Sequence, residues 1–275
     1  QQPFFVWYAP FLPHEPHTPP AAILGKYDDG TRPPNVAKYY AMCDWFDQTC
    51  GELVGHLEHR GIRDDTIIVF LCDNGWAPLE HEADGTAKAP PGWWKHFAPR
   101  SKGSPFERGI RTPIMISWPT HVLAERSDAL ASSLDLMPTL LTACGLSPPP
   151  RLPGINLLDP QQRDARQAVF GGCWSIHNSN PGAPQSTLQY RWCVERQWKL
   201  IRRHHGEDTT RYRLVHAWDD TPVRLFDLAA DPHETQNLAK THQEQVARLT
   251  RATDTAIPAG GGRAAGLGDA TRPDE

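Results

Sequence analysis

The sequence predicts an α/β protein: a partial, doubly wound mixed sheet flanked by helices, followed by a small C-terminal subdomain in which an antiparallel sheet carries a helix. Three observations lead to this prediction. The apolar runs at 4–10, 66–71 and 112–119 lack polar alternation, which is typical of strands covered on both faces. A long segment of helical periodicity separates the first two runs. After about residue 168 the runs become shorter and partly alternating, as in an antiparallel sheet.

The first half of the chain predicts two strands and a helix between them. FFVWYAP (4–10) is aromatic, β-branched and bounded by proline, so we expect a buried strand. It leads into FLPHEPHTPP, whose four prolines favour an extended loop. From Val36 to His59 the apolar side chains recur at helical spacing, and Gly61 ends the pattern. TIIVFL (66–71) then predicts a second buried strand.

A long connection that contains five prolines follows Gly75 and ends at a third predicted strand, TPIMISWP (112–119). Connections of that length in compact domains are usually functional or lack fixed structure. The next segment, 127–145, has a helical pattern with Gly145 after its end. Pro138 lies inside this pattern and should break it, so a second helix could begin there.

The domain organisation follows from where the pattern changes. We assign residues 1–160 to the α/β core and residues 161–257 to the small antiparallel subdomain, which a helix over 242–257 closes. Residues 258–275 are rich in glycine, alanine and proline, and we expect them to be disordered.

The composition argues against several classes of protein. The 275 residues carry a net charge of −4 with scattered Lys and Arg, so the sequence does not predict a nucleic-acid partner. No apolar run approaches the roughly 18 residues of a membrane span. The six cysteines are dispersed and none has CxxC spacing, which argues against structural zinc.

Asp73 and Asn74 are candidate metal ligands because they directly follow the second predicted strand, in FLCDNGWAP. An Asn-Gly step often makes a hairpin turn, but the segment after it is a poor strand. In open parallel sheets, ligands bind at the carboxyl ends of strands. A carboxylate beside an amide carbonyl supplies the hard oxygen donors that Ca²⁺ or Mg²⁺ prefers, although calcium needs roughly six to eight ligands.

Lys102, His14 and His17 are candidates for binding an oxyanion. Their ordinary interpretation is a solvated lysine in a long loop and two partly exposed loop histidines. Near a divalent cation, however, these three side chains would form a positively charged pocket that stabilises sulfuryl or phosphoryl transfer. Their spacing alone leaves open whether they converge.

Five stretches, in this order, resemble the formylglycine-dependent sulfatases of the alkaline-phosphatase superfamily: PFFVWYAPFLPHEPHTPP, TIIVFLCDNGWAP, SKGSPFERGIRTPIMISWP, SSLDLMPTLLTACGLSPPPRLPGINLL and VRLFDLAADPHETQNLA. The resemblance implies that the chain hydrolyses a sulfate ester of a small molecule or glycan. Asp73 and Asn74 would be two of the ligands of a single Ca²⁺, with Mg²⁺ the less favoured metal. An amide after the aspartate fits this one-calcium site better than the histidine of two-metal phosphatases.

The resemblance also implies roles for the basic side chains. Lys102 would contact the sulfate and the leaving oxygen, and Arg111 would brace the loop that presents it. The histidine of the family's PHxP segment would contact the sulfate and protonate the leaving group. Both His14 in PHEP and His17 in PHTP fit this pattern; we favour His14 and keep His17 as the alternative.

Two family elements have no expected counterpart in this chain. One is a Cys- or Ser-x-Pro-x-Arg motif whose first residue becomes formylglycine, the nucleophile; the other is a pair of aspartates that completes the calcium site. Both belong to the N-terminal half of the family. We therefore interpret the chain as a C-terminal portion that is inactive alone, with the missing N-terminal half as a partner. A periplasmic or secreted location is implied by the resemblance only.

Two alternatives stay open at this point. A phosphonate or phosphodiester hydrolase of the same superfamily would share these residues. A fragment without catalytic activity could instead bind an anion or a glycan, with Trp76, Trp93 and Trp94 stacking on a sugar ring; the simpler interpretation is that these tryptophans pack the long loop against the core.

Overall fold

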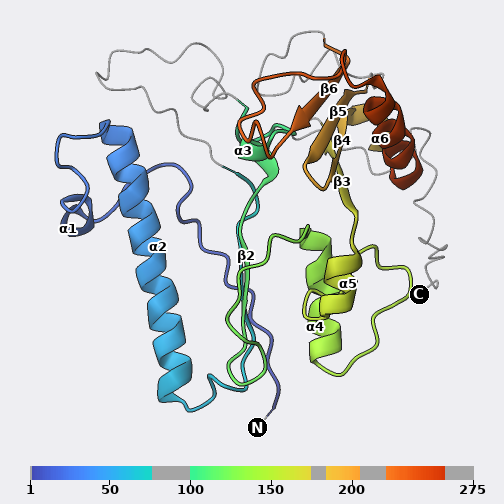
Figure 1. Ribbon diagram of the computed structural model, residues 1–275. Helices are drawn as coiled ribbons and strands as arrows, with labels where there is room; N and C mark the ends of the chain where they lie inside the picture. Colours follow the sequence, from blue (N-terminus) through green and yellow to red (C-terminus); the bar gives the residue numbers. More distant parts are fainter. Residues whose placement is uncertain (1, 76–99, 175–183, 205–220, 258–275) are drawn as a thin grey trace. The chain divides into compact units, whose positions relative to one another are not determined.

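A computed structural model describes residues 2–75, 100–174, 184–204 and 221–257 (Figure 1). The chain forms two compact units, which are described separately. The first comprises Gln1–Ile68, Ala77–Pro99 and Ser117–His121, and the second comprises Val69–Trp76, Arg100–Ile116 and Val122–Glu275. No helix in the described ranges is both long and apolar enough to cross a membrane.

The first unit is built around the long helix α2 (Pro34–His59), against which the short helix α1 (Ala21–Leu24) packs. The predicted helix is confirmed, but it begins at Pro34, because proline lacks the N–H that the first helical position leaves unbonded. The residues of α2 that are buried are Val36, Ala37, Ala41, Met42 and Leu57.

The predicted strand at 4–10 is wrong. These residues have no regular secondary structure, and Phe5 and Trp7 are 77% and 80% exposed. A strand must exchange its backbone hydrogen bonds with a neighbouring strand, and in the described part of the chain no strand pairs with this segment. The apolar composition of residues 4–10 therefore predicted a strand that does not form, because no described strand lies beside it.

The second unit contains the strands, apart from Ile68 and Ser117 at the ends of two of them. The strands β1 (Ile68–Leu71) and β2 (Ile114–Ser117) pair in a two-stranded sheet, and both are shorter than predicted. Within the long connection between them lies a short helix, α3 (Glu107–Ile110), which the sequence did not predict. Residues 76–99 of that connection, including Trp76, Trp93 and Trp94, lie outside the described residues.

The helix predicted over 127–145 is shorter than expected. Residues 127–132 are not helical; a 3₁₀ turn, η2 (Ser133–Asp135), leads into α4 (Leu136–Ala143). Ser132 and Asp135 form a capping box that starts the turn. Pro138 consequently falls in the first turn of α4, where its missing N–H costs no helical hydrogen bond. The helix α5 (Pro160–Ala165) follows.

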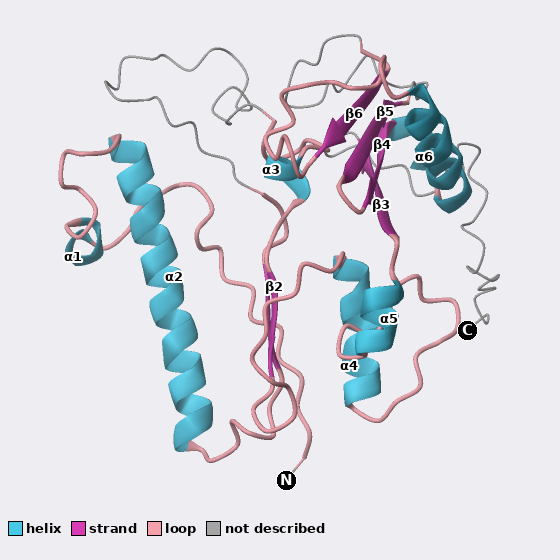
Figure 2. Cartoon of the chain, in the orientation of Figure 1, coloured by secondary structure: helices cyan, strands magenta, loops and turns pink. Residues whose placement is uncertain are grey.

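The predicted antiparallel sheet and its closing helix are confirmed. The sheet has the order β3 (Ala168–Trp174), β4 (Leu188–Glu195), β5 (Trp198–Arg203) and β6 (Val223–Asp227), with every neighbour antiparallel. The helix α6 (Gln243–Ala256) lies against one side of this sheet (Figure 2). Together with the strands and helices above, it confirms the α/β fold class. Residues 258–275 lie outside the described ranges.

The two faces of the antiparallel sheet carry separate apolar clusters. On the α6 face the buried side chains are Cys193, Leu200, Leu225 and Leu249. On the other face they are Phe106, Tyr190, Ile201 and Phe226. Because Phe106 directly precedes α3, the second cluster attaches the segment around α3 to the sheet. This attachment positions the candidate site.

Candidate functional site

The acid and amide predicted to bind a metal occupy the turn after β1. Asn74 Nδ2 donates a hydrogen bond of 2.9 Å to Asp73 Oδ1, and the Cys72 thiol donates to the Asn74 carbonyl at 3.2 Å. Asp73 is exposed and Asn74 is half-buried. The turn therefore presents carboxylate and amide groups side by side at the end of a strand.

Gly75 joins this turn to α3. Its backbone N–H donates to the Gly109 carbonyl at 3.0 Å. A Cβ atom at position 75 would lie 1.9 Å from the Arg108 carbonyl oxygen, which is far inside van der Waals contact. Only glycine allows the two backbones to approach so closely. The residues that follow β1 and those that follow Lys102 are thus held together.

Lys102 lies at the tip of an anchored turn. The N–H of Ser104 donates to the carbonyl of Ser101 at 3.1 Å, and both serines are buried. Gly103 follows Lys102 with φ of 82°, the left-handed conformation that a type II turn requires at its third residue. Lys102 itself is half-buried. The turn therefore holds the lysine backbone rigidly on the same segment that bonds to Gly75.

A buried ion cluster, formed by Glu107, Lys199 and Glu234, holds α3 against the sheet. The Lys199 ammonium, which is fully buried, lies 2.7 Å from Glu107 Oε1 and 2.9 Å from Glu234 Oε1, the second contact lying outside hydrogen-bond geometry. The Glu107 N–H donates to Glu234 Oε2 at 2.7 Å. Burial raises the pKa of Glu234, against the opposing effect of the Lys199 charge.

Sequence reasoning missed Lys199 and Glu234 as parts of this site. Glu234 belongs to the DPHETQNLA stretch, and Lys199 lies between Trp198 and Leu200 in a strand. The signal that could have indicated them was a lysine at a strand position flanked by buried neighbours. Arg111, which was predicted to brace the loop, is 3.7 Å from Glu107 Oε2.

His14 and His17 belong to the first unit and line a single cavity of about 710 Å³ there, together with Lys38. His14 Nδ1–H donates a hydrogen bond of 2.8 Å to the Glu15 carbonyl. The His17 ring lies 5.6 Å from the Tyr39 ring. Burial lowers the pKa of His17, and the nearby Glu15 charge partly opposes this. Because both histidines line one cavity, the geometry alone keeps both as candidates.

Asp73 and Asn74 fit part of a calcium site. Both carry hard oxygen donors, but within the described residues no three His, Cys, Asp or Glu side chains gather as a metal site. Calcium needs roughly six to eight oxygens, so further ligands would have to come from other groups. The oxygen donors of Asp73 and Asn74 suit Ca²⁺, but two residues supply too few of them for a complete site.

The expectation that the chain contains no Ser-x-Pro-x-Arg string is wrong, because residues 147–151 read SPPPR and match that pattern. Ser147 is exposed and follows α4. In the pattern of the resemblance the motif comes before the PHxP segment, whereas this string comes after both the histidines and Lys102. By its position the string belongs to the connection between α4 and α5.

Two family profiles match the chain. The sequence profile described as "Sulfatase" matches residues 1–146, and the one described as "N-sulphoglucosamine sulphohydrolase, C-terminal" matches residues 94–255. The chain belongs to the sulfatase family.

The relatives of this sulfatase chain are longer than it. An N-acetylgalactosamine-6-O-sulfatase of Bacteroides thetaiotaomicron is 28% identical over 91% of the chain and 46% of its own length. An N-acetylgalactosamine-6-sulfatase of Rattus norvegicus is 30% identical over 92% of the chain and 47% of its own length. The crystal structure of Ps i-CgsB shares the fold with a TM-score of 0.65 at 21% identity, over 90% of the chain and 48% of that structure. The chain thus spans about half of each.

Proposed function

We propose that this chain supplies part of the active site of a calcium-dependent sulfatase that hydrolyses the sulfate ester of a sugar or other small molecule. Membership of the sulfatase family supports the reaction class, and two relatives named as N-acetylgalactosamine 6-sulfatases support a sulfated sugar as substrate. Asp73 and Asn74 would hold the Ca²⁺. When bound, the metal would supply positive charge that polarises the sulfate group.

One observation carries this proposal: the backbone contact between Gly75 and α3. The hydrogen bond from Gly75 to Gly109 attaches the Asp73–Asn74 turn to the segment that Lys102 begins. A sulfate ester develops negative charge on its oxygens as its S–O bond breaks, and a lysine beside a calcium ligand pair would stabilise that charge. In this proposal Lys102 binds the sulfate and the leaving oxygen.

A histidine would deliver the proton to the leaving oxygen. It must carry that proton before the bond breaks, and the burial that lowers the pKa of His17 opposes protonation. We therefore assign the acid role to His14 and a sulfate contact to His17. Both line the same cavity.

The nucleophile would come from outside this chain. The formylglycine of the family has no positional counterpart here. Three thiols, those of Cys72, Cys173 and Cys193, are poor substitutes because burial raises the pKa of Cys72, and that of Cys173 and Cys193 to about 12. We propose that an N-terminal portion provides formylglycine and the remaining calcium ligands, and that the 275 residues alone do not turn over sulfate esters.

The test begins with the DNA upstream of this coding sequence. An in-frame Cys-x-Pro-x-Arg segment and an Asp-Asp pair would support the proposal, and the encoded polypeptide can then be assayed with an aryl sulfate and with calcium removed by a chelator. We expect Lys102→Ala to lower kcat by about 10²–10³. Lys240→Ala, at an exposed position, is the matched control.

Three results would contradict the proposal. Equal kcat for Lys102→Ala and Lys240→Ala would show that Lys102 takes no part in the reaction. Turnover of an aryl sulfate by the purified 275-residue chain would show that a nucleophile lies within it. In parallel assays, faster hydrolysis of the matched phosphonate monoester or phosphodiester would favour the alternative activity of the superfamily.

A further inference from the structure

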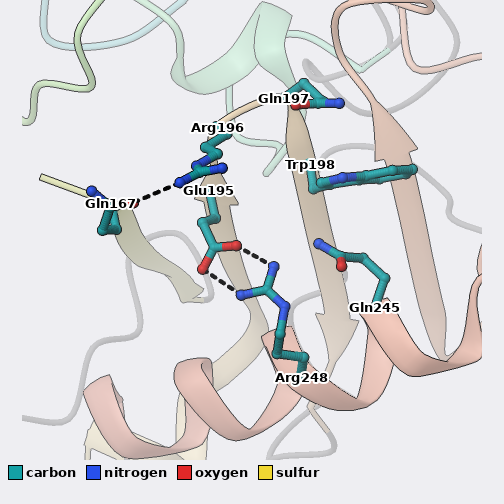
Figure 3. A pocket seen from close by; sticks show the side chains of 7 residues that line it. All are labelled: Gln167, Glu195, Arg196, Gln197, Trp198, Gln245 and Arg248. Carbon is teal, nitrogen blue, oxygen red and sulfur yellow. Dashed lines mark hydrogen bonds and ion pairs between the residues drawn. The ribbon is translucent and has the colours of Figure 1, made fainter.

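A second cavity, of about 620 Å³, opens where the β4–β5 hairpin meets α6 (Figure 3). Its walls include Gln167, Glu195, Arg196, Trp198, Gln245 and Arg248. Trp198 packs partly against the apolar cluster beneath α6, and the neighbouring Lys199 points to the other face, toward α3. Because side chains alternate along a strand, this cavity opens on the α6 face, whereas the ion cluster that holds the Lys102 segment lies on the opposite face.

One side of the cavity is a closed ion pair. The guanidinium of Arg248 donates to both oxygens of Glu195, one of them at 2.7 Å, and Figure 3 shows the two groups facing each other. The hydrogen bonds from Arg248 lower the pKa of Glu195, and the same contact raises the pKa of Arg248. These two side chains neutralise each other and form a fixed wall, so neither is available for a ligand.

The other side has hydrogen-bond donors without acceptors. Gln245 Nε2 is buried and has no hydrogen-bond partner in the part of the chain that the structure describes. The indole N–H of Trp198 likewise has none among the described residues. In the same described ranges, the guanidinium of Arg196 has no carboxylate within 4 Å, and its hydrogen bond is a long one of 3.4 Å to Gln167 Oε1. Of these donors, Gln245 Nε2 is buried, Trp198 is half-buried and Arg196 is exposed, so the cavity combines one buried unpaired donor with two that a ligand can reach. A buried donor without a partner calls for an acceptor, which a ligand can supply.

The chemistry of these groups defines the missing ligand. Three donors favour an oxygen-rich molecule, and the guanidinium of Arg196, which no carboxylate of the described residues contacts, favours a negative one. The Trp198 ring adds an apolar flank, against which the face of a sugar ring can pack. A cavity of this volume is large enough for a small organic ligand.

We infer that this cavity is a binding site for an acidic sugar, a pyranose bearing a carboxylate or a sulfate. Arg196 binds the oxyanion, while the Gln245 amide and the Trp198 N–H donate to ring or hydroxyl oxygens. The inference is independent of the proposed sulfatase activity, because it concerns the sheet face opposite Lys199 and requires neither Lys102 nor calcium.

The test is calorimetric titration of the full 275-residue chain with glucuronate, glucose 6-sulfate, glucose and inorganic sulfate. We expect both acidic sugars to bind more tightly than glucose or inorganic sulfate, and their affinity to fall with added salt. Arg196→Gln should weaken their binding about tenfold, because it removes a charge-assisted hydrogen bond. Gln245→Glu, which is nearly isosteric, should weaken it further by placing a carboxylate beside the bound anion.

The matched control is Arg251→Gln, which removes the same charge from an exposed position of α6 outside the cavity. It should leave the affinity unchanged. Equal losses from Arg196→Gln and Arg251→Gln, or glucose bound as tightly as glucuronate, would overturn the inference. Inorganic sulfate bound as tightly as glucose 6-sulfate would overturn the assignment of a sugar, and absence of binding by both acidic sugars would overturn the site. Circular dichroism of each variant confirms that the sheet is intact.

Discussion

Replacement of Lys199 by methionine tests whether the buried ion cluster holds the candidate site together. Methionine is unbranched and of similar length, so packing in the sheet should change little. The substitution removes the ammonium that lies within 3 Å of both the Glu107 and the Glu234 carboxylates, and Glu234 is 2% exposed. The Glu234 carboxylate would then stay buried without its counter-charge, whereas Glu107 would still have Arg111 at 3.7 Å.

The expected cost is large for a single substitution. Removing one partner of a buried ion pair destabilises proteins by about 3–5 kcal/mol, because the remaining charge stays desolvated. Total unfolding free energies are about 5–15 kcal/mol, so this loss is a substantial share. The loss should shrink at acidic pH. Burial raises the pKa of Glu234, and protonation of Glu234 removes the repulsion between the two side chains.

The assay is urea unfolding followed by circular dichroism, with Lys240→Met as the matched control at an exposed position. Hydrogen exchange supplies a local measurement: the amides of Gly75 and Glu107, which bond to Gly109 and Glu234, should exchange faster in Lys199→Met. A triple variant with Glu107→Gln and Glu234→Gln should recover much of the lost stability. If Lys199→Met and Lys240→Met differ by less than about 0.5 kcal/mol, the cluster does not stabilise the fold.

Three further predictions concern stability. Gly75→Ala should destabilise by about 1–3 kcal/mol in urea unfolding, because its Cβ would meet the Arg108 carbonyl oxygen; a wild-type midpoint would contradict this close approach. His17 has a lowered pKa, so its contribution to stability is present above its unfolded pKa of about 6.5 and is lost as the pH falls through the folded value. The urea midpoint of the wild-type chain should therefore fall on acidification, and the midpoint of His17→Gln should fall less. Identical dependence of the two midpoints on pH would refute this. Asp135→Asn should cost about 3–5 kcal/mol, because Arg166 donates to both oxygens of this buried carboxylate, and a thermal melt within error of wild type would exclude that role.

Local patterns were enough to predict the antiparallel subdomain. Strands β4 and β5 are joined by a short hairpin, and each carries the alternation that places one face against α6. The same reasoning failed for residues 4–10, where the apolar run is present but no described strand lies beside it. Hydrogen bonding between strands is not local, so apolar composition cannot reveal whether a partner exists.

The sequence by itself determined which chemical groups this chain offers: oxygen donors after a strand, a lysine in a proline-rich connection, and two histidines between prolines. It also indicated the family, through the stretches that resemble the sulfatases, and the sulfatase profile matches residues 1–146. Tertiary structure alone decided that Gly75 meets Gly109 and that Lys199 meets a carboxylate 92 positions away. The physical reason is that charge pairing and close backbone contact depend on distance in space, which a one-dimensional pattern does not contain.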